Sequence, residues 1–171
     1  MNLKELNLII KNKSLLRKRL EFFSKKRIIQ RVPLDKAEVL GHIEKAEHNL
    51  NFVKDNLNLG YGDWCVTGCY YAVYHAALAL ILSKGIYSKN HDATLCLLIK
   101  EYFNKGINQE DIFLINEFFI DYLDLVVYVQ AKDKREDATY STKYKFDKES
   151  VEDLRIKAIA FVNKCKTILN S

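Results

Sequence analysis

The sequence predicts an all-α fold, an antiparallel up-and-down bundle of five or six helices. One proline and six glycines in 171 residues are too few for the closely spaced turns of a β-sandwich. Apolar side chains instead recur three and four residues apart along most of the chain, which is the period of a helix. Hydrophobic residues make up 49% of the chain, so we expect it to be globular, and its length suits one compact domain.

The first predicted helix covers residues 3–29 and is strongly basic. Pro33 ends it, because proline disfavours helix at the residue before it. Residues 1–31 carry ten Lys or Arg and two Asp or Glu, a net charge of +8, whereas residues 32–171 carry a net charge of −3. We therefore divide the chain into a basic N-terminal helix extension, residues 1–31, and a helical bundle, residues 34–171. The apolar positions of the extension are Leu6, Ile9, Leu16, Leu20 and Phe23.

Four lysines of this extension recur every seven residues and would form one stripe on a continuous helix. Such a stripe is either a solvated helix face or a surface that contacts phosphates in a salt-sensitive way. Docking of the basic helix onto an acidic face of its own bundle and binding to a membrane surface are further alternatives. The stripe consists of Lys4, Lys11, Lys18 and Lys25.

The next two helices are predicted over residues 35–57 and 63–84. Asp35 is a plausible N-cap of the first, with Glu38 at the capping-box position. The second is apolar nearly all round, so it is expected at the centre of the bundle. Gly85 is a suitable residue to end it. Its small residues would let a neighbouring helix approach closely; they are Cys65, Cys69, Ala72, Ala76 and Ala79.

Three more helices complete the prediction. One covers residues 91–104, one begins near Asn108 as its cap, and one covers residues 149–169. The helix after Asn108 carries Phe118, Phe119 and Tyr122, which serve either the core or a dimer interface. It is expected to continue some way into residues 131–147.

The sequence favours a protein without metal or cofactor. The four cysteines lack the paired close spacing of a structural zinc site, so we interpret them as buried, reduced thiols. No Walker loop, His-Glu-x-x-His or Gly-x-Gly-x-x-Gly motif is present. The longest apolar stretch, residues 68–82, is short for a bilayer span, and no signal peptide is evident. We therefore expect a cytoplasmic protein that does not act in a membrane.

Two sequence blocks carry a resemblance to a known family. The block Tyr70–Ala77 reads YYAVYHAA, and the block Arg135–Tyr140 reads REDATY. Together they resemble the HEPN family of small helical bundles, specifically its short stand-alone prokaryotic branch with an Arg-x-x-Ala-Asp-Tyr motif. Thr139 stands where that branch usually has Asp. The resemblance covers roughly residues 34–169.

The resemblance implies two functional branches. Catalytic HEPN proteins are metal-independent ribonucleases in which a His follows an Arg after four to six residues and two motifs meet across a homodimer. Other members bind nucleotides or partner a small nucleotidyltransferase in toxin–antitoxin pairs. This sequence has no such Arg–His pair and no His after His91; Tyr140 stands at the corresponding distance from Arg135. A tyrosine of ordinary pKa, about 10, is a poor base at pH 7. Arg135 could equally be a solvated surface cation, and Tyr140 a ring that caps the bundle.

Three further residues near the first block are candidates. His75 lies on an apolar helix face, where a His is more often a core residue bonded to a neighbour than a catalyst. His91 is expected at a helix start, where its neutral ring could accept a backbone N–H. Lys89 beside it could meet a phosphate.

The leading hypothesis is a non-catalytic HEPN-like homodimer that binds a nucleotide, RNA or a nucleotidyltransferase partner. Its candidate ligand-binding residues are Arg135, Tyr140, Lys89, His91, Lys4, Lys11, Lys18 and Lys25. The first alternative is a metal-independent ribonuclease toxin that uses Arg135 with Tyr140. The second is a structural protein-interaction module.

Overall fold

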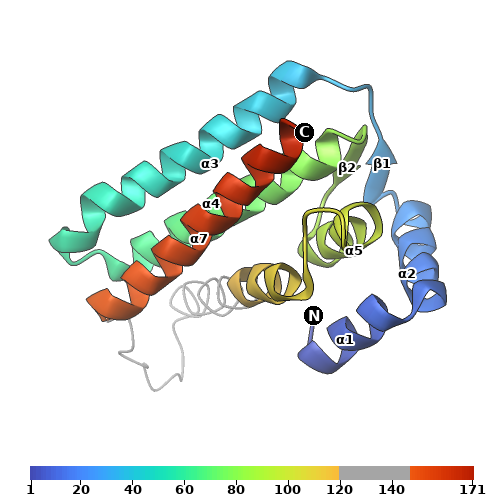
Figure 1. Cartoon of the computed structure of the whole chain (residues 1–171), viewed down its shortest axis with the longest axis horizontal. Coiled ribbons are helices and arrows are strands. Elements are labelled where there is room, and N and C mark those ends of the chain that lie inside the picture. Colours follow the sequence, from blue (N-terminus) through green and yellow to red (C-terminus); the bar gives the residue numbers. More distant parts are fainter. Residues whose placement is uncertain (120–146) are drawn as a thin grey trace, which may run out of the picture.

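The computed structural model describes residues 1–119 and 147–171, and the fold is mostly helical. Three long helices lie side by side and form the main layer of the bundle (Figure 1). They are α3 (Lys36–Asn56), α4 (Gly62–Leu82) and α7 (Lys148–Leu169). The predicted bundle, with α4 at its centre, is confirmed.

The α3–α4 pair is an antiparallel hairpin joined by the short 3-10 helix η1 (Leu57–Leu59). Asp35 caps α3 as expected, since its carboxylate accepts the backbone N–H groups of Ala37 and Glu38. The turn closes at Gly60, whose φ of 84° is left-handed and therefore suits glycine.

The close approach predicted along α4 is found at Cys65, whose Sγ lies 3.8 Å from the Val53 carbonyl oxygen of α3, and at Gly68, which the predicted stripe did not include. The predicted small-residue positions of α4 are fully buried, and a Cβ placed on Gly68 would lie 2.6 Å from Val53 Cγ2 of α3. The backbones of α3 and α4 are thus closer at this point than a pair of ordinary side chains allows. The four cysteines are buried and unbridged, as expected. By length and composition α4 could also cross a membrane, but 78% of the relevant stretch is buried inside the bundle.

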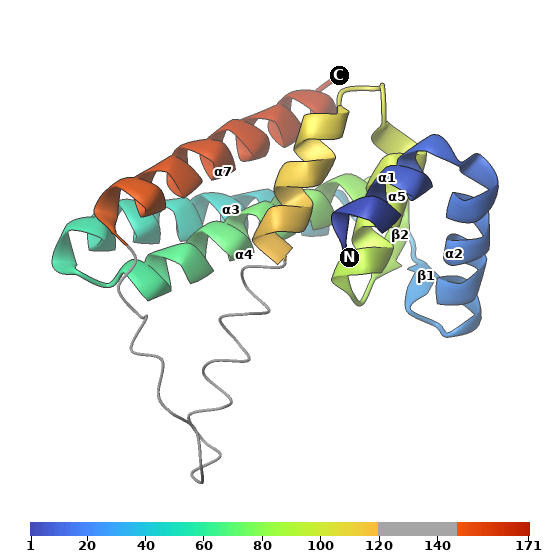
Figure 2. The ribbon, with the colours of Figure 1, turned by 90° about the horizontal axis from the view of Figure 1, so that it is seen from below.

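A second group of helices packs beside α4 and α7. It contains α5 (His91–Tyr102) and a helix that begins at residue 109 and is described up to residue 119 (Figure 2). Asn108 caps the latter as predicted: its side chain accepts the Asp111 N–H, and the Asp111 carboxylate accepts the Asn108 N–H. Phe118 and Phe119 are buried, which assigns them to the core, whereas Tyr122 lies outside the described residues.

The basic extension differs from the single helix that the sequence predicted. It consists of α1 (Leu3–Lys11), α2 (Lys13–Lys25) and the strand β1 (Ile29–Arg31). The break falls at Asn12, whose extended backbone ends α1 and whose side chain accepts the Leu15 N–H to cap α2. The apolar spacing correctly predicted helix on each side of Asn12. A repeat of seven residues does not reveal that a residue inside it ends one helix and caps the next.

Strand β1 pairs antiparallel with β2 (Ile86–Ser88), in the register Ile29 to Ser88. The sequence predicted no strand, and these are too short for periodicity to reveal. Flanking bonds from Val32 N–H to the Gly85 carbonyl and from Lys89 N–H to the Ile28 carbonyl extend the connection. The extension therefore packs on its own bundle.

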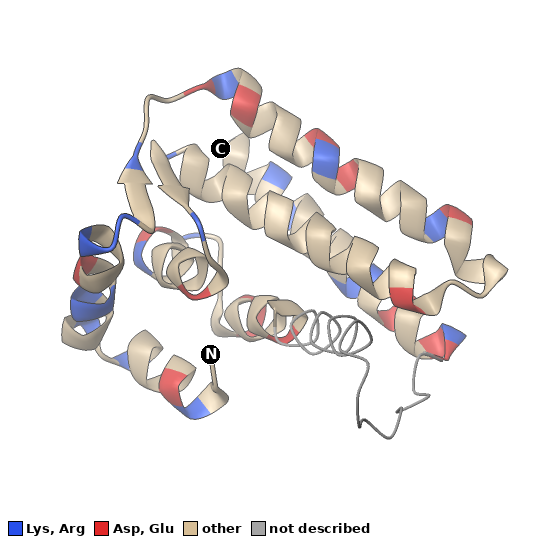
Figure 3. Cartoon of the chain, turned by 180° about the vertical axis from the view of Figure 1, so that it is seen from behind, with Lys and Arg blue, Asp and Glu red and all other residues tan. Residues whose placement is uncertain are grey.

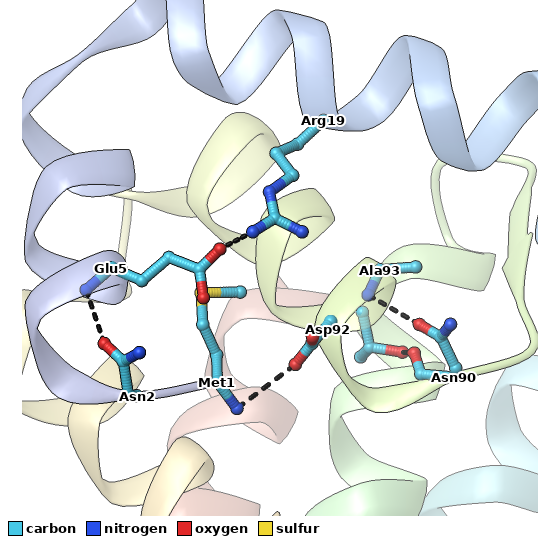
Figure 4. Close-up of polar contacts among 8 residues, drawn as sticks. Met1, Asn2, Glu5, Arg19, Asn90, Asp92 and Ala93 are labelled. Carbon is cyan, nitrogen blue, oxygen red and sulfur yellow. Dashed lines mark hydrogen bonds and ion pairs between the residues drawn. The ribbon is translucent and has the colours of Figure 1, made fainter.

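Polar contacts reinforce that docking at the start of α5 (Figure 4). The Met1 amino group lies 3.3 Å from the Asp92 carboxylate of α5, and within the extension Arg19 of α2 forms an ion pair with Glu5 of α1. Four apolar side chains of the extension are buried against the bundle: Leu6, Ile9, Leu16 and Phe23.

Candidate functional site

The candidate site is built around one side of α4. Tyr70, Tyr71, Tyr74 and His75 stand one helical turn apart in two pairs, so their side chains share one side of the helix. This is the block that carries the sequence resemblance. It meets α3 on one side and the start of α5 on the other, and each contact contains a histidine.

On the α3 side, His42 and His75 form a hydrogen bond between their Nδ1 atoms, which lie 2.8 Å apart. One Nδ1 must donate its proton and the other must accept it, so the accepting ring has to be a neutral imidazole and the two rings cannot both be cations while the bond exists. Burial lowers the pKa of His75 to about 4, and the adjacent His42 and Lys45 contribute to that shift. Burial also lowers the pKa of His42, against an opposing effect of Glu38.

The His42–His75 pair is therefore neutral at pH 7. The expectation that His75 is bonded to a neighbour is confirmed, although the ring is half-buried rather than fully in the core. The partner was not predicted, because only the register of α3 against α4 brings His42 to it. The pair joins the two helices through a neutral contact that both rings lose if they become cations.

On the α5 side, the Tyr70 hydroxyl and His91 Nε2 lie 2.7 Å apart. His91 also stacks on Phe119 with ring centroids 4.4 Å apart, and the Tyr74 ring meets it edge-on. Burial is the largest cause that lowers the pKa of His91, with Asp92 opposing it. Burial raises the pKa of Tyr74, so that phenol remains protonated at neutral pH.

The expected position of His91 at a helix start is confirmed. It is the first residue of α5, directly after the N-cap Asn90, whose side chain accepts the Ala93 N–H. The structure places His91 Nε2 against a tyrosine hydroxyl, however, rather than against a backbone N–H. Tyr70 and His91 thereby link α4 to α5 through a partly buried polar contact.

The predicted lysines are all exposed, but the structure does not gather them. Lys4 and Lys11 belong to α1, whereas Lys18 and Lys25 belong to α2, so the break at Asn12 divides the predicted stripe between two helices. Lys89 is exposed at the end of β2. The phosphate-binding role of these side chains stays a prediction.

Arg135 and Tyr140, the candidates from the second sequence block, lie outside the described residues. Their role therefore stays a sequence-based prediction, as does the expected continuation of the preceding helix into residues 131–147. The site that the structure does describe is the α4 face with its two histidine contacts.

The described residues offer no cluster of three or more His, Cys, Asp or Glu that could hold a metal ion. Burial raises the pKa of Cys69 and of Cys96 to about 12, and it raises the pKa of Cys165 as well. These thiols are therefore protonated at neutral pH, and a protonated thiol is a poor ligand and a poor nucleophile.

The chain matches the model of the HEPN domain over residues 39–168. It is 32% identical over 136 residues to "Putative toxin MJ0142" of Methanocaldococcus jannaschii, which covers 80% of this chain and 84% of that protein. It is 30% identical over 132 residues to "UPF0332 protein" of Archaeoglobus fulgidus, covering 75% of this chain and 92% of that protein. A second M. jannaschii protein, "Putative toxin MJ0605", is 29% identical over 133 residues, covering 77% and 89%.

The family match spans both sequence blocks, the α4 face and most of the final helix. It confirms the family that the two blocks resembled and agrees with the helical fold. Residues 1–38 lie before the matched region, so the α1–α2–β1 extension is an addition to the part that the family model describes. The chain belongs to the HEPN domain family.

Proposed function

We propose that this protein acts in a toxin–antitoxin type system, as a HEPN protein that binds RNA or a nucleotide without the Arg–His ribonuclease pair. The observation that carries the proposal is the match to "Putative toxin MJ0142", which extends over most of both chains. A small nucleotidyltransferase is the proposed partner, and a homodimer is the proposed assembly.

The arrangement of the histidines argues against an Arg–His ribonuclease. The sequence has four, all at or before residue 91, and none follows an Arg at the distance that the ribonuclease motif requires. Of the described rings, His42 and His75 are bonded to each other and His91 is bonded to Tyr70. These contacts hold helices together, which is a structural use of the imidazoles.

Arg135 is the proposed cation for the phosphate of the ligand, with Tyr140 beside it in the same motif. Lys89 and His91, together with Lys4, Lys11, Lys18 and Lys25, are proposed as further contacts. A guanidinium can bind a phosphate through two parallel hydrogen bonds, which a single ammonium group cannot do.

The test compares Arg135→Ala with Lys134→Ala, which removes the same charge one position earlier. Each protein is induced in a host cell, and growth is followed; each is also titrated with RNA and with nucleotides at several salt concentrations. We expect growth arrest by the parent and by Lys134→Ala, loss of arrest with Arg135→Ala, and ligand binding that weakens as salt rises. Equal behaviour of the two variants would contradict the proposed role of Arg135.

The ribonuclease alternative has one observation in its favour, the presence of Arg135 and Tyr140 at the motif spacing. It is separated by incubating RNA with the purified protein in excess chelator. Cleavage by the parent that disappears in both Arg135→Ala and Tyr140→Phe would establish that alternative. Intact RNA with retained binding supports the non-catalytic proposal.

A further inference from the structure

A groove of about 480 Å³ lies between the N-terminal extension and the end of α5. We refer to it as the α2–α5 groove. One wall is a single face of α2, because the four α2 residues that line the groove recur three and four positions apart along that helix. The other wall is the last turn of α5 together with the turn that follows it. It is lined by Ile10, Lys13, Leu16, Arg17, Leu20, Ile99, Lys100, Phe103, Asn104 and Lys105.

The groove combines an apolar floor with a rim of one charge sign. Five of its lining residues are apolar, four are Lys or Arg, and none is Asp or Glu. Arg17 lies 3.6 Å from Glu21 and Lys100 lies 2.8 Å from Glu101, so these two cations are partly neutralised. Lys13 and Lys105, in contrast, form no ion pair with any residue that the structure describes.

Lys13 has a position that helix stability does not explain. It is the first residue of α2, and the first turn of α2 contains no acidic residue. The N-terminus of a helix already carries partial positive charge, so a cation there is unfavourable for helix stability. The charge of Lys13 and the partial charge of the helix N-terminus both add to the positive potential of the groove. Figure 3 shows how densely Lys and Arg occupy α2 and the turn that follows it.

We propose that the α2–α5 groove binds an acidic amphipathic helix of a partner protein. A helix can lay apolar side chains from successive turns along the apolar floor while its flanking carboxylates meet the cations of the rim. The proposal goes beyond the proposed function and does not depend on it. Because residues 10–20 precede the region matched by the family model, one wall of the groove belongs to this chain's own extension.

The floor favours a protein partner over RNA. Its apolar side chains are four aliphatic residues and one aromatic residue, Phe103. Single-stranded nucleic acid is held by several aromatic rings on which successive bases stack, and an aliphatic surface does not provide that contact. Leu and Phe side chains of an amphipathic helix, in contrast, are removed from water by the same surface.

The experiment uses the full chain and a synthetic, fluorescently labelled peptide. The peptide is helical, with Leu at positions i, i+3, i+4 and i+7 and Glu on both sides of that stripe. Two control peptides replace either the four Leu by Ser or every Glu by Lys. The protein variants are Lys13→Glu/Lys105→Glu and the matched double reversal Lys54→Glu/Lys148→Glu, whose exposed lysines do not line the groove. Circular dichroism verifies that both variants retain their helix content.

We expect the acidic peptide to bind at low ionic strength and the Ser and Lys peptides to bind at least tenfold more weakly. Lys13→Glu/Lys105→Glu should weaken acidic-peptide binding by about tenfold, whereas the distant reversal should leave it within about twofold. Absence of binding, equal weakening by both double variants, or undiminished binding of the Ser peptide would each overturn the proposal. Displacement of the peptide by single-stranded RNA, with the same dependence on Lys13 and Lys105, would assign the groove to nucleic acid and overturn it too.

Discussion

The close approach of α3 and α4 makes a sharp prediction for two glycines in helix interiors. A methyl group added to Gly41 of α3 would meet nothing within 4 Å beyond its chain neighbours and the nearby backbone of its own helix, whereas a methyl group added to Gly68 of α4 would lie 2.6 Å from Val53 Cγ2. Alanine is favoured over glycine in a helix by about 0.5–1 kcal/mol. Gly41→Ala should therefore raise the free energy of unfolding by about that amount.

The same propensity gain applies to Gly68→Ala, but the packing contribution has the opposite sign. Carbon atoms in contact prefer a separation of about 3.5–4.0 Å, so the methyl group requires a shift of about 1 Å. Val53 is fully buried and β-branched, and it cannot rotate away from the contact without disturbing its neighbours. Overpacking of this kind costs about 1–3 kcal/mol, so we expect a net destabilisation of about 0.5–2 kcal/mol.

The assay is urea unfolding of the parent and both variants, followed by far-ultraviolet circular dichroism. For a chain of this length, each kcal/mol also shifts Tm by about 2–4 °C, so a thermal melt provides an independent measure. The two variants should move the transition in opposite directions. If Gly68→Ala stabilises the protein as much as Gly41→Ala does, then α3 and α4 are not in close contact at this point and the reasoning is refuted.

Three further predictions concern the polar contacts. The pKa of His75 is about 4 in the folded chain against an ordinary 6.5, so the unfolded chain takes up the proton first as pH falls. The free energy of unfolding should therefore fall as the pH is lowered from about 6.5 to 4. The corresponding fall in the urea midpoint should be smaller in His75→Leu. The Asp111 carboxylate accepts hydrogen bonds from Lys164 Nζ at 2.6 and 2.8 Å, and it also caps its own helix by accepting the Asn108 N–H. Asp111→Ala should therefore lower the free energy of unfolding by about 2 kcal/mol, whereas Lys164→Met, which leaves the cap intact, should lower it by less. Equal losses in the two variants would contradict the capping role. Asn12→Ala should cost about 1 kcal/mol through loss of the α2 cap, with faster amide exchange confined to α1 and α2; an unchanged exchange pattern would show that packing alone sets the break.

The sequence predicted the long helices well because their signals are local and repeated. Asp35 and Asn108 cap helices where their positions indicated, and the small residues predicted along α4 are fully buried. Residues 86–88, by contrast, form a strand only because residues 29–31 lie beside them, and no local pattern contains that partner. Asn12 is similar, since a residue that caps one helix can also lie on the surface of a longer one.

The candidate site was less predictable for the same reason. His75 and His91 could each be selected as histidines on a helix, but their partners His42 and Tyr70 are set by how α3, α4 and α5 pack. The lysine stripe was inferred from one uninterrupted helix and is divided by the break at Asn12. No sequence signal identifies Lys13 as a groove residue, because its neighbours in the groove include residues of α5 far along the chain.

The packing of the N-terminal extension on α5 has a consequence for the order in which the chain folds. The α1 and α2 helices leave the ribosome before α5, which packs against α2 and ends at Tyr102. At about 5–20 residues per second, synthesis takes roughly 4 to 15 s to proceed from the end of α2 to the end of α5. During that interval the apolar side chains of α2 lack the α5 surface that packs against them in the finished fold. The newly made extension is therefore a segment that other proteins, including chaperones, can reach before its own bundle does.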